Sequence, residues 1–239
     1  MVKLVIDKGN SSIKYGIFDQ EKLIAVDSTS HSDQRKLVSV IEQFSPELAI
    51  ISSVTSDDDH SLILDRIAQT IILDSNTPLP FINEYETPET LGRDRIALAA
   101  GVTYLCPGRS VLAIDAGTAI TYDVVIDGNI YIGGNISPGM MMRFKALNAF
   151  TGRLPLVSSD DFRDLIGKTT HQAIASGVIN GIVFEMEGYR RMVEQEWGIT
   201  DCFITGGDSD FFAGKLKKPI FANQNLVLFG LNRILEYNA

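Results

Sequence analysis

The pattern of apolar and polar residues predicts an alternation of short strands and helices along the whole chain. In the first half it predicts strands over 2–7, 13–19, 22–26 and 48–54 and helices over 33–44, 61–70 and 93–105. In the second half it predicts strands over 111–115, 119–126, 129–136 and 202–205 and helices over 139–149, 170–196 and 225–237. The acidic run at 57–59 would favour the N-terminus of the helix over 61–70. This order of elements is typical of an α/β fold in which mixed β-sheets are flanked by helices.

One short motif occurs twice, once near the beginning of each half. Residues 5–10 read VIDKGN and residues 113–118 read AIDAGT, so each copy has an apolar strand, an aspartate, a glycine and a polar residue in the same order. Each copy continues into a second strand and then into an aspartate-centred turn, at Asp19 and at Asp127. A single such hairpin is a weak signal, but two in register indicate an internal duplication.

The duplication predicts two related lobes. Pro107 and Gly108 end the helix over 93–105, and the second copy of the motif begins just after them. We therefore expect an N-terminal lobe over 1–109 and a C-terminal lobe over 110–239.

The two hairpin turns have the composition of phosphate-binding loops. Gly9 and Gly117 have no side chain that would keep a phosphate away from the main chain. Short polar side chains beside them can donate hydrogen bonds to phosphate oxygens: Asn10, Ser11, Ser12 and Thr118. The alternative is a pair of structural hairpins whose aspartates only cap the turns.

Charged residues at these turns would complete a phosphate site. Asp7 and Asp115 stand at strand ends that we expect to face a shared cleft, where they could hold hydrated magnesium or another cation. Lys14, if it points into the same cleft, acts as a point charge on phosphate. Phosphoryl transfer needs one further group, which orients or deprotonates the acceptor hydroxyl.

The run Gly-Arg-Asp-Arg at 92–95, at the start of a predicted helix, offers such a group. In a functional reading, Asp94 accepts the proton of a substrate hydroxyl and Arg95 holds a substrate anion or a phosphate. In a structural reading, Asp94 stabilises the helix dipole and the arginines are solvated. The run alone leaves both readings open.

Two glycine-rich turns follow later strands. The run GGNISPG at 133–139 would aim helix N–H groups at an anion or let another segment pass closely, and a purely structural turn fits it equally well. The run GGD at 206–208 suits a main-chain wall for a nucleobase or a ribose.

Composition restricts the class of protein. The chain has 239 residues, 45% of them hydrophobic, and a net charge of −9, which argues against a nucleic-acid-binding protein because that needs a basic face. A single nucleotide is still possible, since main-chain N–H groups and one or two cations can hold its phosphates. Cys106 and Cys202 have no partner motif and are expected to be reduced. No segment has a signal-peptide or membrane-spanning pattern, so we expect a soluble, cytoplasmic protein without a membrane partner.

Together these motifs resemble those of the type III pantothenate kinases, bacterial enzymes of coenzyme A synthesis. Five elements occur in the family's order: DKGNS at 7–11, GRDR at 92–95, DAGTA at 115–119, GGNISPG at 133–139 and TGGD at 205–208. The resemblance implies the duplicated ribonuclease H-like fold of actin, sugar kinases and Hsp70. It also implies ATP-dependent phosphorylation of pantothenate to 4'-phosphopantothenate. Ser11 stands where the family usually has threonine and keeps the hydroxyl.

The resemblance also implies roles for individual residues. The ATP-binding residues would be Asp7, Lys8, Gly9, Asn10, Ser11, Ser12, Ile13, Lys14 and Thr118. The pantothenate site would be formed by Tyr85, Gly92, Arg93, Asp94, Arg95 and Thr170, with Asp94 as the catalytic base. Asp115 would bind a monovalent cation, potassium or ammonium, and magnesium-ATP would be the co-substrate. Members of the family are homodimers whose substrate pocket is completed across the interface, so a homodimer is expected.

Two other functions fit the same motifs. One is another small-molecule kinase or phosphohydrolase of this fold, acting on a sugar or a polyphosphate, although the chain is shorter than the larger sugar kinases. The other is a non-catalytic, nucleotide-binding regulator. Loss of a catalytic carboxylate would favour the regulator, whereas Asp7, Asp94 and Asp115 are all present.

Overall fold

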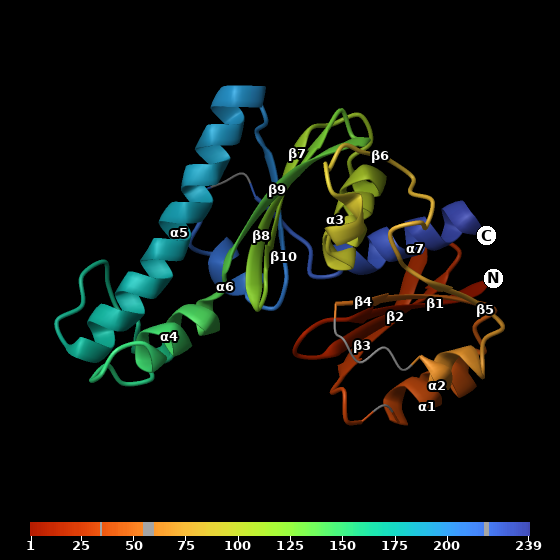
Figure 1. Cartoon of the computed structure of the whole chain (residues 1–239), viewed down its shortest axis with the longest axis horizontal. Helices are drawn as coiled ribbons and strands as arrows, with labels where there is room; N and C mark the ends of the chain where they lie inside the picture. The colour runs from red at the N-terminus through yellow and green to blue at the C-terminus, as the bar shows by residue number, and fades with distance from the viewer. Residues whose placement is uncertain (34, 55–59, 218–219) are drawn as a thin grey trace. The chain divides into compact units, whose positions relative to one another are not determined.

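The structure of the protein is a computed structural model that describes residues 1–33, 35–54, 60–217 and 220–239 (Figure 1). The acidic run at 57–59, which was predicted to favour a helix N-terminus, lies outside the described residues. The chain divides into two compact units. The first unit consists of Met1–Ser110, Val124–Gly133 and Asn225–Ala239, and the second of Val111–Asp123 and Gly134–Gln224.

The first unit contains a five-stranded sheet with strand order β3-β2-β1-β4-β5. Strand β1 runs antiparallel to β2 and parallel to β4. The elements of this unit are β1 (Val2–Lys8), β2 (Ile13–Asp19), β3 (Lys22–Thr29), α1 (Arg35–Phe44), β4 (Leu48–Ser53), α2 (Ser61–Leu64), β5 (Gln69–Ile72), β6 (Ile82–Asn83), the short 3-10 helix η1 (Pro88–Thr90), α3 (Arg93–Leu105) and α7 (Leu226–Asn238).

Both faces of this sheet are covered by helices (Figure 1). On one face, Leu4 and Ile6 of β1 pack in a core cluster with Leu37 and Ile41 of α1. On the other face, β1 and β4 contact α7, and β4 also contacts α3. Because successive side chains of a strand point to opposite faces, every residue of β1 is assigned to one helical layer or the other.

A second sheet has six strands in the order β11-β10-β7-β8-β9-β6. Strands β8 and β9 each contribute residues to both units. The remaining elements are β7 (Val111–Ala116), β8 (Ala119–Ile126), β9 (Ile130–Pro138), α4 (Met140–Ala149), the 3-10 helix η2 (Ser159–Asp161), α5 (Thr170–Trp197), β10 (Asp201–Thr205), α6 (Ser209–Ala213) and β11 (Phe221–Ala222). Asp127 and Gly128 both have positive φ, as a type I′ hairpin turn between β8 and β9 requires.

The two sheets repeat one topology, which agrees with the predicted duplication. In the first, β1 lies between its hairpin partner β2 and the later strand β4. In the second, β7 lies between its hairpin partner β8 and the later strand β10, which pairs with it in parallel. The repeated DxG motif therefore marks the equivalent central strand of each sheet.

Most of the predicted elements are present with small changes at their ends, but the helix predicted over 61–70 is wrong. Helix α2 ends at Leu64, and residues 69–72 form β5, which pairs in parallel with β4 and places Ile71 beside Ile50. The β-branched residues Thr70, Ile71 and Ile72 favour this strand, and pairing with a buried neighbour outweighs the helical spacing of the preceding residues. The short elements β6, β11 and α6 were not predicted.

The division into lobes over 1–109 and 110–239 stays a prediction. The chain first passes from the first compact unit to the second after Ser110, close to the predicted boundary. However, α7 comes from the end of the chain and belongs to the first unit.

Helices α3 and α7 pack closely at two glycines. A Cβ placed on Gly230 would lie 1.7 Å from the carbonyl oxygen of Ala97, and one placed on Gly101 would lie 2.4 Å from that of Leu226. Because these neighbours are main-chain atoms, they cannot move aside as the end of a flexible side chain can. The absence of side chains at 101 and 230 therefore sets the distance between the two helices.

We predict that Gly230→Ala destabilises the protein by about 2–3 kcal/mol, since the added methyl overpacks the α3–α7 contact. Urea denaturation followed by circular dichroism measures the change in the free energy of unfolding. Gly152→Ala is the matched control, because a Cβ at Gly152 meets no atom within 4 Å. Equal stabilities of the two variants would show that the helices separate without cost.

Candidate active site

The first phosphate-loop candidate is the hairpin between β1 and β2. Asp7 pairs with Lys14 across this hairpin, and Lys8 pairs with Ile13, so residues 9–12 form the connection. The side chains of Asn10, Ser11 and Ser12 are exposed, and a ring nitrogen of His31 lies 2.9 Å from the carbonyl oxygen of Gly9. The loop thus presents short polar side chains next to a glycine, as the sequence predicted.

Asp7 and Lys8 point to opposite faces of the sheet. Asp7 shares the face of Lys3, whose ammonium pairs with Glu236 of α7, whereas Lys8 shares the face of Leu4. The buried ammonium of Lys8 lies 3.1 Å from the Nδ1 atom of His60, at the start of α2. Lys8 was predicted to bind ATP, but its side chain points away from Asp7, so only its main chain belongs to the loop.

Asp7 lies in an unusual electrostatic environment. Its Oδ1 atom is buried and has no hydrogen-bond partner among the described residues. Burial and the nearby charge of Asp94 raise the pKa of Asp7 to about 7, although Lys14 and Ser52 oppose this shift. A buried carboxylate oxygen without a partner has the chemistry to accept a proton or to ligate a hard cation such as magnesium.

Asp94 lies in the first turn of α3, close enough for its charge to act on Asp7. Its Oδ1 atom accepts a hydrogen bond of 2.9 Å from the main-chain N–H of Arg95. A Cβ at Gly92 would lie 2.4 Å from the same oxygen, so the glycine leaves room for the carboxylate. The turn at 92–95 and the first loop therefore bring two predicted site carboxylates together within the first unit.

Arg95 forms a second group of predicted site residues, with Tyr85. Arg95 is buried, and its guanidinium carbon lies 5.4 Å from the centre of the Tyr85 ring. It also lies 6.0 Å from the ring of Tyr131, a fully buried residue of β9 that sequence reasoning missed. The neighbouring Arg93 is half-buried. A positive charge held beside two aromatic rings has the chemistry to bind an anion.

The second unit contains the other acidic turn, at the end of β7. Asp115 pairs with Thr205 of β10, which places the turn at 206–208 beside it. Gly206 has a φ of 92°, and a Cβ there would lie 2.3 Å from Oδ1 of Asp115 and 2.5 Å from the carbonyl oxygen of Ala116. Only a glycine fits this position. Burial also raises the pKa of Asp208, whose main-chain N–H donates to the Ala116 carbonyl over 2.9 Å.

The turn at the end of β7 offers oxygen atoms as possible ligands for a cation. Carboxylate and carbonyl oxygens, such as those of Asp115 and Ala116, are the ligands that hard cations prefer. Among the described residues, no cluster of three or more His, Cys, Asp or Glu side chains could hold a metal ion. A cation at this turn would therefore be held in part by main-chain oxygens.

The turn that contains Thr118 is held by the glycine-rich segment predicted over 133–139. The main-chain N–H of Gly139 donates to the carbonyl of Thr118 over 3.1 Å. A Cβ at Gly139 would lie 2.3 Å from the carbonyl oxygens of both Gly117 and Thr118. The main chain of Gly139 therefore packs directly against the second loop and is hydrogen-bonded to it. The side chain of Thr118 is exposed.

Thr170 is the first residue of α5 and belongs to the second unit. Its side chain is exposed. The preceding Thr169 caps the helix, because its hydroxyl accepts a hydrogen bond of 3.2 Å from the main-chain N–H of Gln172. Thr170 is thus oriented by a regular helix N-terminus and is available to contact another molecule.

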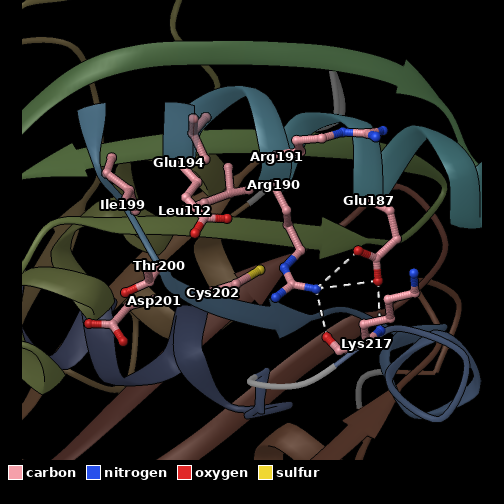
Figure 2. Close-up of a pocket in the computed structure, with 11 residues that line it drawn as sticks. Leu112, Glu187, Arg190, Arg191, Glu194, Ile199, Thr200, Asp201, Cys202 and Lys217 are labelled. Carbon is pink, nitrogen blue, oxygen red and sulfur yellow. Dashed lines mark hydrogen bonds and ion pairs between the residues drawn. The ribbon is translucent and has the colours of Figure 1, made fainter. Parts of the chain in front are cut away.

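A surface cavity of about 260 Å³ lies elsewhere in the second unit, between α5 and β10 (Figure 2). Within it, Arg190 pairs with Glu187 and donates to the main-chain carbonyl of Lys217 over 2.6 Å. Burial raises the pKa of the lining Cys202 to about 12, so the thiol stays protonated. None of the predicted site residues lines this cavity. We do not assign it to the active site.

Comparison with known structures shows that other proteins share this fold over nearly their whole length. A putative Baf family transcriptional activator from Campylobacter jejuni has a TM-score of 0.65 at 23% identity, with 98% of each chain covered. A putative N-acetylmannosamine kinase from Listeria monocytogenes has a TM-score of 0.55 at 14% identity, with each chain fully covered. The predicted duplicated fold of the actin, sugar kinase and Hsp70 type is therefore confirmed, while these distant likenesses say nothing further about function.

Sequence comparison identifies the family within this class. Residues 3–192 match the model of the type III pantothenate kinases. A type III pantothenate kinase of Phocaeicola vulgatus is 45% identical over 239 residues, which cover 99% of each chain. The chain belongs to the type III pantothenate kinase family, and it is a phosphotransferase. Separately, no helix among the described residues is long and apolar enough to cross a membrane.

The raised pKa of Asp7 predicts a pH-dependent stability of the nucleotide-free protein. The ordinary pKa of an aspartate is 3.8, so between pH 4 and pH 7 the folded state binds more protons here than the unfolded state does. The free energy of unfolding should therefore fall as the pH rises through this range, by about 4 kcal/mol in total, and level off above it.

Urea denaturation at several pH values without nucleotide or divalent cations measures this change. Asp7→Asn removes the titrating group and isolates its contribution from those of other residues. The pH profile of the variant should be flatter than that of the wild type by the predicted amount. Parallel profiles would mean that Asp7 titrates alike in both states.

Proposed function

We propose that this chain transfers the terminal phosphoryl group of ATP to the primary hydroxyl of pantothenate and forms 4'-phosphopantothenate, in the first step of coenzyme A biosynthesis. The observation that carries the proposal is the proximity of Asp94 to Asp7 at the first loop, within a member of the type III pantothenate kinase family. A hydroxyl bound at Asp94 would lie next to the loop that binds the phosphates. Asp94 would accept the proton of that hydroxyl as it attacks the phosphorus.

The phosphates would be bound mainly by main-chain N–H groups and short side chains. The first loop offers the N–H groups of 9–12 and the hydroxyls of Ser11 and Ser12, with the exposed side chain of Asn10 beside them. Lys14, on the same face as Asp7, would place its positive charge near the phosphates. Thr118, which belongs to the second unit, would bind ATP through its exposed hydroxyl.

Pantothenate would be bound by the residues around the 92–95 turn. It carries a carboxylate, which the guanidinium of Arg95 would bind beside Tyr85. Main-chain groups at Gly92 and Arg93 would orient the chain of the substrate so that its hydroxyl meets Asp94. Thr170 would supply a further polar contact.

Two cations fit the residues described above. Magnesium would accompany ATP, and the partnerless Oδ1 of Asp7 is a suitable oxygen for it or for one of its bound waters. A monovalent cation, potassium or ammonium, would lie at the oxygens of Asp115 and Ala116. Both would neutralise negative charge on the phosphates.

We also propose that the protein is a cytoplasmic homodimer that associates through the second unit. Several large apolar side chains of α4 and α5 are exposed, among them Met141, Met142, Phe184 and Met192. A group of exposed apolar side chains on neighbouring helices is typical of a surface that another protein covers. A partner there would lie on the same long helix that begins with Thr170.

We predict that Asp94→Asn lowers kcat by about 10²-fold or more, because asparagine fills the same space but cannot accept the proton. Steady-state rates with ATP and pantothenate measure this loss, and calorimetry should show that ATP still binds. Asp127→Asn, at an exposed hairpin turn, is the control and should keep full activity. Undiminished kcat in Asp94→Asn would remove the proposed base, and faster phosphorylation of a hexose than of pantothenate would overturn the substrate.

We predict that Asp115→Asn and Gly206→Ala both abolish the stimulation of activity by potassium. The first removes the charge of the cation ligand, and the second places a methyl group where the carboxylate lies. Initial rates are measured against potassium chloride, with choline chloride holding the ionic strength constant. A potassium response equal to that of Asp127→Asn would exclude this turn as the cation site.

A further inference from the structure

Tyr131 occupies a central place among the aromatic residues beside Arg95. It is fully buried in β9, and its ring centre lies 6.3 Å from those of both Phe81 and Tyr85. The guanidinium carbon of Arg95 lies 6.0 Å from the Tyr131 ring and 5.4 Å from the Tyr85 ring. Arg95 is thus held against two rings that belong to different segments of the first unit.

The main chain around Tyr131 also fixes the segment that carries Tyr85. Strand β6 pairs in parallel with β9, so that Asn83 is the partner of Tyr131. The N–H of Glu84 donates to the carbonyl of Tyr131 over 2.9 Å, and the side-chain oxygen of Asn83 accepts from the N–H of Tyr85 over 3.1 Å. Tyr131 therefore contacts Tyr85 through its ring and holds the residue before it through its main chain.

Gly133 of β9 lies next to the ring of Tyr85. It has a φ of 122°, and a Cβ built there would lie 3.6 Å from the Tyr85 ring. A residue with a side chain would strain this main chain because of its positive φ, and the 3.6 Å distance places the main chain of Gly133 next to the ring. The ring of Tyr85 therefore lies next to β9 at both Tyr131 and Gly133.

This arrangement restricts an otherwise flexible cation. A free arginine side chain loses rotamer entropy when it is fixed. An aromatic face attracts the guanidinium and limits its orientation. When the packing of the protein has already imposed that order, an anion that binds Arg95 does not incur the loss again.

We propose that Tyr131 is a positioning residue for substrate binding, which holds the guanidinium of Arg95 and the ring of Tyr85 in the orientation that receives the carboxylate of pantothenate. It acts through these two side chains and not by touching the reacting atoms. The inference rests on the proposed function and deepens it, since it names a determinant of affinity for the anionic end of the substrate.

The proposal is tested with Tyr131→Phe and Tyr131→Leu, assayed at varied pantothenate and at varied ATP. Phenylalanine keeps the ring, so its KM for pantothenate should stay within about 2-fold of the wild type. Leucine removes the ring, and its KM for pantothenate should rise about 10-fold while its KM for ATP and its kcat change less than about 3-fold. An unchanged KM for pantothenate in Tyr131→Leu would overturn the proposal.

Phe18→Leu is the matched control for lost core volume. Phe18 is an equally buried ring of the same unit, and it packs against Phe229 of α7. The Phe18→Leu variant should be less stable than the wild type, as Tyr131→Leu is, but its KM for pantothenate should be unchanged. A similar rise of that KM in Phe18→Leu would mean that loosening the unit, and not the loss of the Tyr131 ring, causes the effect.

An uncharged competitor separates the carboxylate from the rest of the substrate. Panthenol replaces the carboxylate of pantothenate by an alcohol, so its inhibition constant should change less than about 2-fold in Tyr131→Leu. An equal loss of affinity for both compounds would overturn a role through Arg95. If the wild-type protein does not phosphorylate pantothenate at all, the proposed function fails first, and this outcome is distinct from failure of the Tyr131 proposal.

Discussion

The pairing of β1 along both of its edges is the constraint on which the first unit depends. Strand β1 bonds to β2 on one side and to β4 on the other, and helices cover both faces, so each of its side chains must enter one layer or the other. This alternation sends Asp7 toward the layer of α3 and α7 and sends Lys8 toward α2. The carboxylate of Asp7, at the end of β1, therefore lies near the first turn of α3, which carries Asp94. Strand β7 repeats the arrangement with Asp115.

Close main-chain contacts give the candidate site its precision. At Gly92, Gly139 and Gly206 a side chain would collide with a carboxylate or with a carbonyl oxygen of the acidic turns. Each of these glycines thus fixes the position of an oxygen atom in or beside the proposed site. The same residues make the site sensitive to small displacements, because main-chain atoms in contact cannot adjust separately.

The sequence predicts the long periodic elements well, since α3, α5 and the two acidic hairpins carry strong local patterns. It fails at β5, where pairing with β4 decides the structure and no local signal reveals that partner. The motif residues of the site were found through their types and order. Their mutual placement was not, because the parallel register that brings Ser52 beside Asp7 is a long-range property. Tyr131 was missed for the same reason: in β9 it reads as an ordinary core residue.

The place of α7 has a consequence for how the chain acquires its structure. Helix α7 packs against α3 and β1, its Glu236 pairs with Lys3, and Asn238 bonds to the carbonyl of Pro78. During synthesis the residues of the first sheet leave the ribosome long before 226–238 do. The part of the sheet face that α7 covers is therefore exposed while the second unit is made, although α3 is already present beside it. The core that supports Asp7 closes last, so a chain released before its final helix would expose that apolar face to chaperones and proteases.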